Sequence, residues 1–292
     1  MLDRRVFVSI VGLVAAVVGL CGATFSRSSA AAEPKGLMMV VMDPLALPLS
    51  CPCVKDYAQR DYDKLAAHLS KRLGVPVSVE FSESLTTAVK TKTNGRADIV
   101  IGKQSVVLNQ AKANALKLAH VAALTGKDGA TTQTGLFVVA AEDKALTVSD
   151  LKSHRIIFGS PDADEKHAAA IELLEALDVP VAIASQRETC TACSDGATKI
   201  IELHTGGVKA ATVISSYAKP LLEGCGTIKK GDLRVVGETD PVPFVAAFVN
   251  ESLPAERRQA IAQALLAIGE EPKLLAALET KSGFVVPPAK KK

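Results

Sequence analysis

Short apolar runs of strand length alternate with amphipathic segments of helix length, and this alternation restricts the fold more than any other feature of the chain. Residues 36–42 are continuously apolar, which is typical of a strand buried on both faces. Residues 61–73 place Leu65, Leu69 and Leu73 on one helical stripe, which ends before Gly74 and Pro76. Repeated strand–helix units predict a mostly parallel sheet covered by helices, because parallel strands are joined through helical crossovers.

The same pattern continues to residue 268. Further strands are expected at residues 75–81, 97–101, 119–124, 135–140, 155–158, 179–184, 210–215, 233–236 and 244–249. Further helices are expected at residues 84–93, 105–116, 166–177, 196–204, 217–222 and 255–268, and residues 147–150 fit a capped helix start.

Two similar sets of units predict an α/β protein of two lobes. A polar stretch near residue 130 and the Asp240–Pro243 break indicate two crossings between the lobes. We therefore expect a signal segment at 1–32, the first part of lobe 1 at 33–134, lobe 2 at 135–237, a return to lobe 1 at 238–280 and a flexible basic tail at 281–292. Such an arrangement places a ligand cleft between the lobes, at strand ends and helix N-termini.

The first 32 residues have the pattern of a secretory signal peptide. Arg4 and Arg5 precede an apolar run from Val6 to Phe25, and Ala30–Ala32 supplies small residues for cleavage. A membrane anchor is the alternative, since the run is about long enough to span a bilayer. Cleavage would release a periplasmic or secreted protein into a compartment where disulfides persist.

Charge and motifs exclude several functions. With 34 Lys and Arg against 31 Asp and Glu, the chain lacks the basic excess of a nucleic-acid-binding protein. Neither a Walker loop nor a Gly-x-Gly-x-x-Gly loop is present, and Ser160 and Ser215 lie outside any nucleophile-elbow pattern. Export together with two lobes favours a binding protein over an enzyme, and we expect this protein to be a monomer.

Several motifs, in this order, resemble one family. They are residues 97–102 followed by Ser105, residues 134–139 leading to 149–152, residues 156–161, residues 194–197 and residues 240–243. The order is similar to that of the type 2 periplasmic-binding-protein fold, in particular the phosphate/phosphonate-binding proteins of ABC importers. The resemblance covers residues 36–270. It implies a mostly parallel two-lobe fold with two interlobe crossings, capture of a small ligand by hinge closure and delivery to a membrane permease.

The pocket motifs depart from this family. Phosphonate-binding relatives carry Ser and Thr residues that hold an oxyanion after a Gly-x-Pro turn, whereas this chain has Asp162, Ala163, Asp164 and Glu165 there. Carboxylates at a helix start would repel a phosphate, which argues against an inherited phosphonate specificity. The ligand, which an oxyanion would still fit, is expected to contact Lys103, Gln104, Ser105, Thr131, Thr132, Asp162, Asp164, Ser194, Asp195 and Ser215.

Five cysteines lie in or near these loops, and the sequence leaves three interpretations of their role open. Cys190 and Cys193 could form a local disulfide, and Cys51 or Cys53 could pair with Cys225. No cofactor is required, but the thiolates together with His167 or His204 could bind copper or zinc. The third interpretation is thiol–disulfide redox chemistry at the Cys-x-x-Cys motif. The corresponding alternative functions are metal delivery and an accessory role beside a periplasmic redox enzyme.

Overall fold

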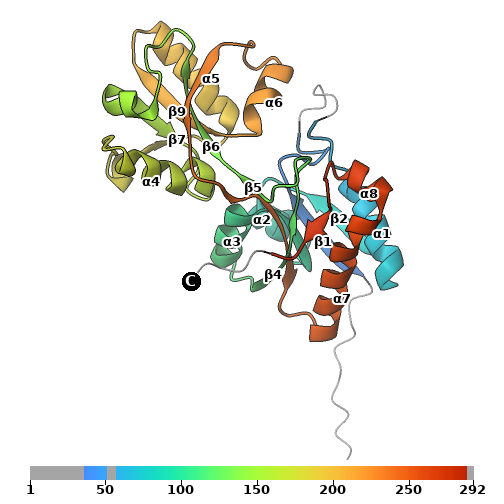
Figure 1. The fold of residues 1–292 in the computed structure, drawn as a ribbon. Coiled ribbons are helices and arrows are strands. Elements are labelled where there is room, and N and C mark those ends of the chain that lie inside the picture. Colours follow the sequence, from blue (N-terminus) through green and yellow to red (C-terminus); the bar gives the residue numbers. More distant parts are fainter. Residues whose placement is uncertain (1–35, 51–56, 288–292) are drawn as a thin grey trace, which may run out of the picture. The chain divides into compact units, whose positions relative to one another are not determined.

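The first lobe is built on a mixed six-stranded sheet with the order β13-β4-β12-β3-β1-β2 (Figure 1). The computed structural model describes residues 36–50 and 57–287, which belong to one compact unit, Lys35–Lys292. The strands of this sheet are β1 (Leu37–Met42), β2 (Val77–Phe81), β3 (Ile99–Lys103), β4 (Leu118–Leu124), β12 (Val245–Asn250) and β13 (Phe284–Val285).

Helices cover both faces of this sheet, as the continuously apolar first strand predicts. Met39 and Val41 of β1 face a core formed with α1 (Tyr62–Leu73), α7 (Ala255–Leu266) and α8 (Pro272–Ala277). Val40 and Met42 alternate to the other face and pack against α2 (Leu85–Thr87), the π-helix η1 (Ala88–Lys92) and α3 (Gln104–Ala113). The 3-10 helix η5 (Ala267–Glu270) continues α7.

The second lobe repeats this layering around a five-stranded sheet with the order β10-β6-β9-β7-β8. Its strands are β6 (Gly135–Ala140), β7 (Arg155–Phe158), β8 (Glu188–Thr189), β9 (Ala210–Ser215) and β10 (Leu233–Glu238). Its helices are η2 (Val148–Ser153), η3 (Asp164–Lys166), α4 (Ala168–Ala176), η4 (Ala184–Gln186), α5 (Cys193–Thr205) and α6 (Ala218–Gly224). One face packs on α4 and the other on α5 and α6.

Two extended segments join the lobes. They pair as a short antiparallel ladder between β5 (Thr132–Gln133) and β11 (Val242–Pro243), in the two stretches where the sequence indicates crossings. The structure therefore has the α/β two-lobe architecture that the element order predicts, with both connections side by side (Figure 1).

Most strands of each sheet run in one direction, as expected. The exceptions are β6 and β12, the strands that follow the two crossing segments, and the short β13, each of which pairs antiparallel with its neighbours. Two sequence expectations differ from the structure. Residues 179–184 form no strand, since only Val179 at the start of this run is buried and the sheet edge is taken by β8. Residues 284–285 belong to β13 rather than to a tail, because Phe284 is buried in the first core.

Gly135 marks a close approach that positions the site. A Cβ atom there would lie 1.9 Å from the main-chain oxygen of Glu165. Only glycine therefore lets β6 run past η3 at this distance.

Within the described residues, no helix is long and apolar enough to cross a bilayer.

Candidate functional site

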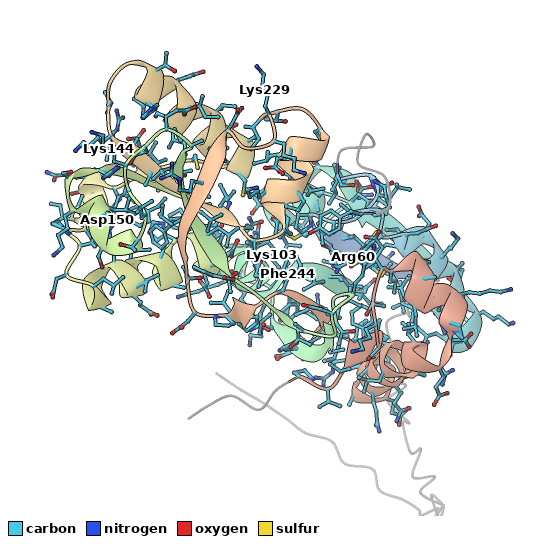
Figure 2. The ribbon with its side chains drawn as sticks, turned by 45° about the horizontal axis from the view of Figure 1, so that its top comes forward. Arg60, Lys103, Lys144, Asp150, Lys229 and Phe244 are labelled. Carbon is cyan, nitrogen blue, oxygen red and sulfur yellow. The ribbon has the colours of Figure 1, made fainter. Side chains whose placement is uncertain are left out.

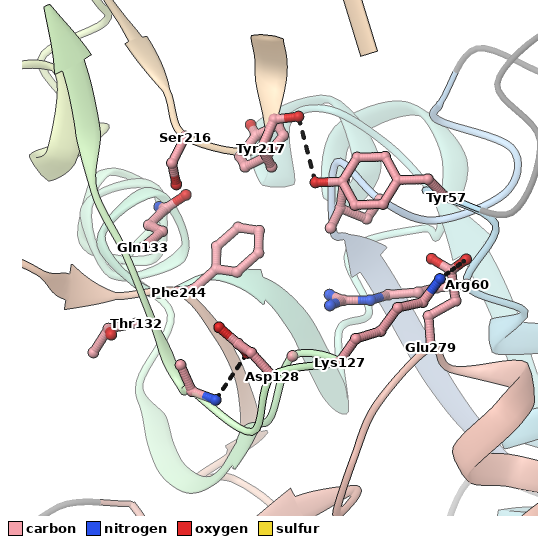
Figure 3. A pocket seen from close by; sticks show the side chains of 13 residues that line it. Tyr57, Arg60, Lys127, Asp128, Thr132, Gln133, Ser216, Tyr217, Phe244 and Glu279 are labelled. Carbon is pink, nitrogen blue, oxygen red and sulfur yellow. Dashed lines mark hydrogen bonds and ion pairs between the residues drawn. The ribbon is translucent and has the colours of Figure 1, made fainter. Parts of the chain in front are cut away.

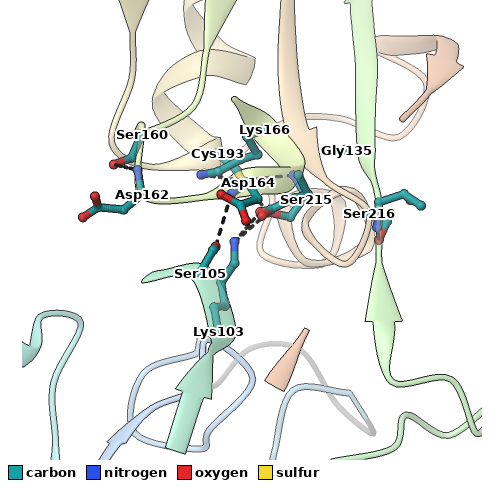
Figure 4. Close-up of polar contacts among 12 residues, drawn as sticks. Lys103, Ser105, Gly135, Ser160, Asp162, Asp164, Lys166, Cys193, Ser215 and Ser216 are labelled. Carbon is teal, nitrogen blue, oxygen red and sulfur yellow. Dashed lines mark hydrogen bonds and ion pairs between the residues drawn. The ribbon is translucent and has the colours of Figure 1, made fainter. Parts of the chain in front are cut away.

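A buried ion pair joins the two lobes (Figure 4). Lys103 ends β3 in the first lobe, and its ammonium donates to the Glu165 carboxylate from η3 in the second lobe. The Ser215 hydroxyl, at the end of β9, donates to the same carboxylate oxygen at 2.6 Å. The two charged side chains are 8% and 0% exposed. Burial by itself would raise the pKa of the Glu165 carboxyl, but Lys103 and Ser215 hold this pKa below its ordinary value.

Other polar contacts between the lobes surround this pair. The main-chain N–H of Asp164 donates to the Ser105 hydroxyl at 3.2 Å. The Gln110 amide donates to the Asp162 carboxylate at 3.5 Å. Burial and the neighbouring Glu165 raise the pKa of Asp164. The loop 162–165 is therefore held against the start of α3 by hydrogen bonds as well as by charge.

A second buried ion pair lies at the start of α1. Arg60 donates to the Asp43 carboxylate at 2.8 Å, and the Tyr62 hydroxyl donates to the same oxygen at 2.6 Å. Burial disfavours the charged guanidinium, yet Asp43 raises the pKa of Arg60 above its ordinary value. Arg60 is 3% exposed and remains a cation whose charge Asp43 balances.

Next to Arg60 lies a cavity of about 300 Å³ (Figure 3). Segments of both lobes and the crossing strand β5 contribute to its wall. The lining residues are Leu45, Tyr57, Arg60, Gly126, Lys127, Asp128, Ala130, Thr132, Gln133, Ser216, Tyr217, Phe244 and Glu279. The Tyr57 hydroxyl donates to the Tyr217 carbonyl at 3.4 Å, and burial raises the pKa of the Tyr57 phenol. The cavity is of the size that small-molecule sites have.

Aromatic rings and cations form one wall of the cavity. Tyr217 and Phe244 are stacked, with ring centroids 5.3 Å apart. The Arg60 guanidinium lies 5.8 Å from the centroid of Phe244, and the Lys103 ammonium lies 5.6 Å from that of Tyr217. Figure 2 shows Arg60, Lys103 and Phe244 close together, far from Lys144 and Asp150. The stacked rings therefore lie between the cavity and the Lys103–Glu165 ion pair, since Tyr217 contacts both Phe244 and the Lys103 ammonium.

Two buried polar atoms at the cavity lack partners. Arg60 Nε, a donor, and Gln133 Oε1, an acceptor, have no hydrogen-bond partner among the described residues. Both side chains line the cavity, and both are more than nine-tenths buried. Buried polar atoms are almost always hydrogen-bonded, so an unpaired donor and acceptor at one cavity indicate a place for a ligand or for ordered water.

The structure brings some of the sequence-predicted residues together and leaves others apart. Five of them meet around the interlobe ion pair, namely Lys103, Ser105, Asp162, Asp164 and Ser215. Thr132 lines the cavity. The main-chain carbonyl of Thr131 accepts the Phe244 N–H. Gln104 begins α3. Ser194 and Asp195 instead lie in the first turn of α5, where Asp195 accepts the Ala192 N–H at 3.3 Å.

The cysteines of the described segments are free thiols, namely Cys190, Cys193 and Cys225. The local disulfide between Cys190 and Cys193, one of the interpretations that the sequence left open, is not formed in the described structure. His167 contacts the Gly159 carbonyl and the Phe158 ring. Residues 36–50 and 57–287 contain no cluster of three or more metal-ligating side chains. Cys51 and Cys53 lie outside the described residues, so a copper or zinc site that includes them stays a prediction.

Sequence reasoning missed Arg60, Tyr217 and Phe244, which line the cavity. Gln133, which also lines the cavity, and Glu165, which completes the ion pair, lie in loops that the sequence indicates, but neither was singled out as a ligand contact. Gln133 lies in the polar stretch that indicates a crossing, and Phe244 follows the Asp240–Pro243 break. Crossing segments border the cleft, so their position was a usable signal. No sequence pattern indicated that Glu165 pairs with Lys103, which is 62 residues away.

The same fold occurs in solved structures of binding proteins. A component of a phosphonate ABC transporter from Pseudomonas aeruginosa matches with a TM-score of 0.63 and 16% identity, over 87% of this chain and 82% of that one. A protein of Prochlorococcus marinus in complex with methylphosphonate matches with a TM-score of 0.61 and 15% identity, over 88% and 94%. A protein of Xanthomonas citri bound to ATP matches with a TM-score of 0.61 and 15% identity, over 88% and 92%. No curated protein sequence matches this chain.

Two lobes joined by paired crossing strands, with a ligand-sized cavity beside the crossing, define a periplasmic-type solute-binding protein. The sequence narrows this class further. Residues 55–290 match the family described as "ABC transporter, phosphonate, periplasmic substrate-binding protein", and the chain belongs to this family. It is the solute-binding component of an importer.

Proposed function

We propose that this protein binds a small neutral or zwitterionic solute in the cavity beside the crossing strands, rather than a phosphonate dianion. The observation that carries the proposal is the pair of unpartnered buried atoms, Arg60 Nε and Gln133 Oε1. A solute that offers an acceptor to Arg60 and a donor to Gln133 would satisfy both. The stacked rings of Tyr217 and Phe244 supply an apolar wall for the rest of the molecule.

The charges around the cavity support a solute without net negative charge. Asp43 balances Arg60, Glu279 pairs with Lys127 at 3.2 Å, and Glu165 balances Lys103. Asp128, which also lines the cavity, adds a negative charge. The cations at the site are therefore already neutralised by carboxylates of the chain. A dianion entering the cavity would be desolvated without a compensating positive charge.

The proposal also covers export of the protein, its permease partner and its oligomeric state. Export through the signal segment 1–32 would deliver the protein to the periplasm, and a membrane permease would receive the solute. We expect a monomer that binds its solute without a catalytic step. The relatives bound to methylphosphonate and to ATP show that the fold accepts different ligands, at sequence identities too low to transfer either one to this chain.

Titration calorimetry with a panel of solutes tests the proposal. Methylphosphonate and phosphate represent the anions, and amino acids and neutral sugars represent the other classes. We expect binding from the second set only. With the best solute, Gln133→Leu removes one acceptor and Arg60→Lys removes the Nε donor while keeping the charge beside Asp43. Each variant is expected to weaken binding by about 5- to 150-fold, the loss of one buried hydrogen bond.

Lys144→Ala is the matched control, since Lys144 is exposed and far from the cavity (Figure 2). It should leave the affinity unchanged. Tight binding of methylphosphonate would overturn the proposed solute class. Binding of a neutral solute that is insensitive to both variants would place the site elsewhere.

A further inference from the structure

The groups that the cavity offers for hydrogen bonding to a solute come from two parts of the chain. The acceptors Asp128 and Gln133 belong to the segment that leads into the first crossing. The donor, Arg60, precedes α1. Figure 3 shows Gln133 and Arg60 on opposite sides of the Phe244 ring, with Asp128 below it. A solute that contacts all three groups must therefore carry hydrogen-bond donors toward the crossing segment and an acceptor toward the guanidinium.

A tight turn fixes the direction of the Asp128 carboxylate. Its Oδ1 atom accepts the Ala130 N–H at 2.9 Å, and the Gly126 N–H donates to the Ala130 carbonyl at 2.7 Å. A Cβ atom at Gly126 would lie 2.6 Å from this Oδ1, so glycine leaves room for the carboxylate. The turn thus holds one carboxylate oxygen and leaves the other, Oδ2, without a hydrogen-bond partner among the described residues.

The charge of Asp128 is not balanced, whereas the other charges that line the cavity are. Lys127 is paired with Glu279 at 3.2 Å, and Arg60 with a buried carboxylate at 2.8 Å. Lys281, whose side chain lies against the same turn, is not a lining residue. In the part of the chain that the structure describes, Asp128 forms no ion pair. The cavity and its immediate surroundings therefore have one carboxylate more than they have cations.

A cation of the solute completes this arrangement better than a neutral hydroxyl group does. A bound solute displaces water from Asp128, and a carboxylate that loses water is compensated fully only by a partner that supplies both a hydrogen bond and an opposite charge. The stacked rings are less suited to receive that cation. The Arg60 guanidinium already lies 5.8 Å from the Phe244 centroid. The Lys103 ammonium lies 5.6 Å from the Tyr217 centroid.

We propose that the solute is a small amino compound. Its protonated amino group contacts the Asp128 carboxylate and Gln133 Oε1, and a hydrogen-bond acceptor at its other end contacts Arg60 Nε. A zwitterionic amino acid has both groups within one small molecule, which suits a cavity of about 300 Å³. The inference rests on the proposed function, because it uses the same cavity. It narrows the solutes to those with an ammonium group and makes Asp128 the residue that determines specificity.

Matched pairs of solutes test the amino group directly. The common amino acids and glucosamine are titrated calorimetrically, each beside the analogue in which a hydroxyl group replaces the amino group, such as L-lactate for L-alanine and glucose for glucosamine. We expect at least one amino compound to bind, and to bind at least about tenfold more tightly than its hydroxyl analogue. A hydroxyl analogue that binds as tightly, or the failure of every amino compound to bind, would overturn the inference.

Asp128→Asn tests the residue that determines specificity. It keeps the Oδ1 acceptor for the Ala130 N–H and removes the charge, so the turn and the thermal unfolding midpoint should be retained. Binding of the amino compound should weaken by about tenfold or more, and binding of its hydroxyl analogue by less than about threefold. Glu142→Gln removes the same charge from an exposed position outside the cavity and should change neither affinity. An Asp128→Asn effect as small as that of Glu142→Gln would refute the role of Asp128.

Two other outcomes separate the amino compound from the broader solute class. Binding of glucose that is lost in Gln133→Leu and kept in Asp128→Asn would overturn the amino compound but leave the proposed function standing. Tight binding of methylphosphonate would overturn both, because the cavity would then accept a dianion beside an unbalanced carboxylate. Binding of an amino acid that both Gln133→Leu and Asp128→Asn weaken would support both.

Discussion

Removal of the Glu165 carboxylate is the sharpest perturbation of the interlobe contact. Glu165→Gln keeps the shape of the side chain but leaves the Lys103 ammonium, which is 8% exposed, without its counter-charge. A buried charge whose partner is removed destabilises a protein by about 3–5 kcal/mol. With a urea slope of about 3 kcal/mol/M, the unfolding midpoint should fall by about 1–2 M.

Urea unfolding followed by circular dichroism measures this change in midpoint, and two further variants serve as controls. Lys103→Met combined with Glu165→Gln removes the unpaired ammonium and should recover most of the lost stability. Glu80→Gln breaks the Lys92–Glu80 pair, whose side chains are 40% and 30% exposed, and should change the free energy of unfolding by less than about 1 kcal/mol. A Glu165→Gln effect as small as that of Glu80→Gln would refute the reasoning, because the pair would then behave as if solvated.

Three further predictions follow from the same structure. The pKa of Glu165 is lower in the folded state than in the unfolded state. The carboxylate therefore contributes to the free energy of unfolding above the unfolded pKa of about 4.3, and this contribution is lost as the pH falls through the lower folded pKa. Urea midpoints measured between pH 7 and pH 3 should decline more steeply for the wild type than for Glu165→Gln. Asp43→Asn should lower the free energy of unfolding by about 3–5 kcal/mol, because it strands the buried Arg60 guanidinium; an effect below about 1 kcal/mol in the same assay would contradict this. Gly135→Ala should destabilise by more than about 1 kcal/mol, because its Cβ would lie 1.9 Å from the Glu165 oxygen, whereas Gly206→Ala, with its nearest atom at 3.4 Å, should be close to neutral by thermal unfolding.

The Lys103–Glu165 ion pair bridges the two lobes without a ligand. In a two-lobe binding protein a ligand stabilises the closed arrangement by bridging the lobes. Here the chain's own Lys103, Glu165 and Ser215 provide such a bridge. The solute consequently need not supply the charge that draws the lobes together, which is consistent with a neutral or zwitterionic ligand.

The sequence by itself determined the alternation of strands and helices, and with it the two-lobe α/β architecture. Residues 36–42 and 61–73 illustrate why, since local hydrophobic periodicity reports which faces of an element are buried. The interpretation that the loop at 162–165 is unsuited to a phosphate stays a prediction. The strand expected at 179–184 is wrong because only Val179 of this run is buried: Val181 is half-buried against the core of the second lobe, and the other four residues are exposed.

Tertiary structure alone decided the rest. Strand direction depended on how β6 and β12 enter their sheets after the crossings, and no local pattern encodes that choice. The pairs Lys103–Glu165 and Arg60–Asp43 join residues that are 62 and 17 positions apart. Whether such groups are buried, balanced or left without a partner depends on the packing around them, because desolvation and charge pairing act through space rather than along the chain.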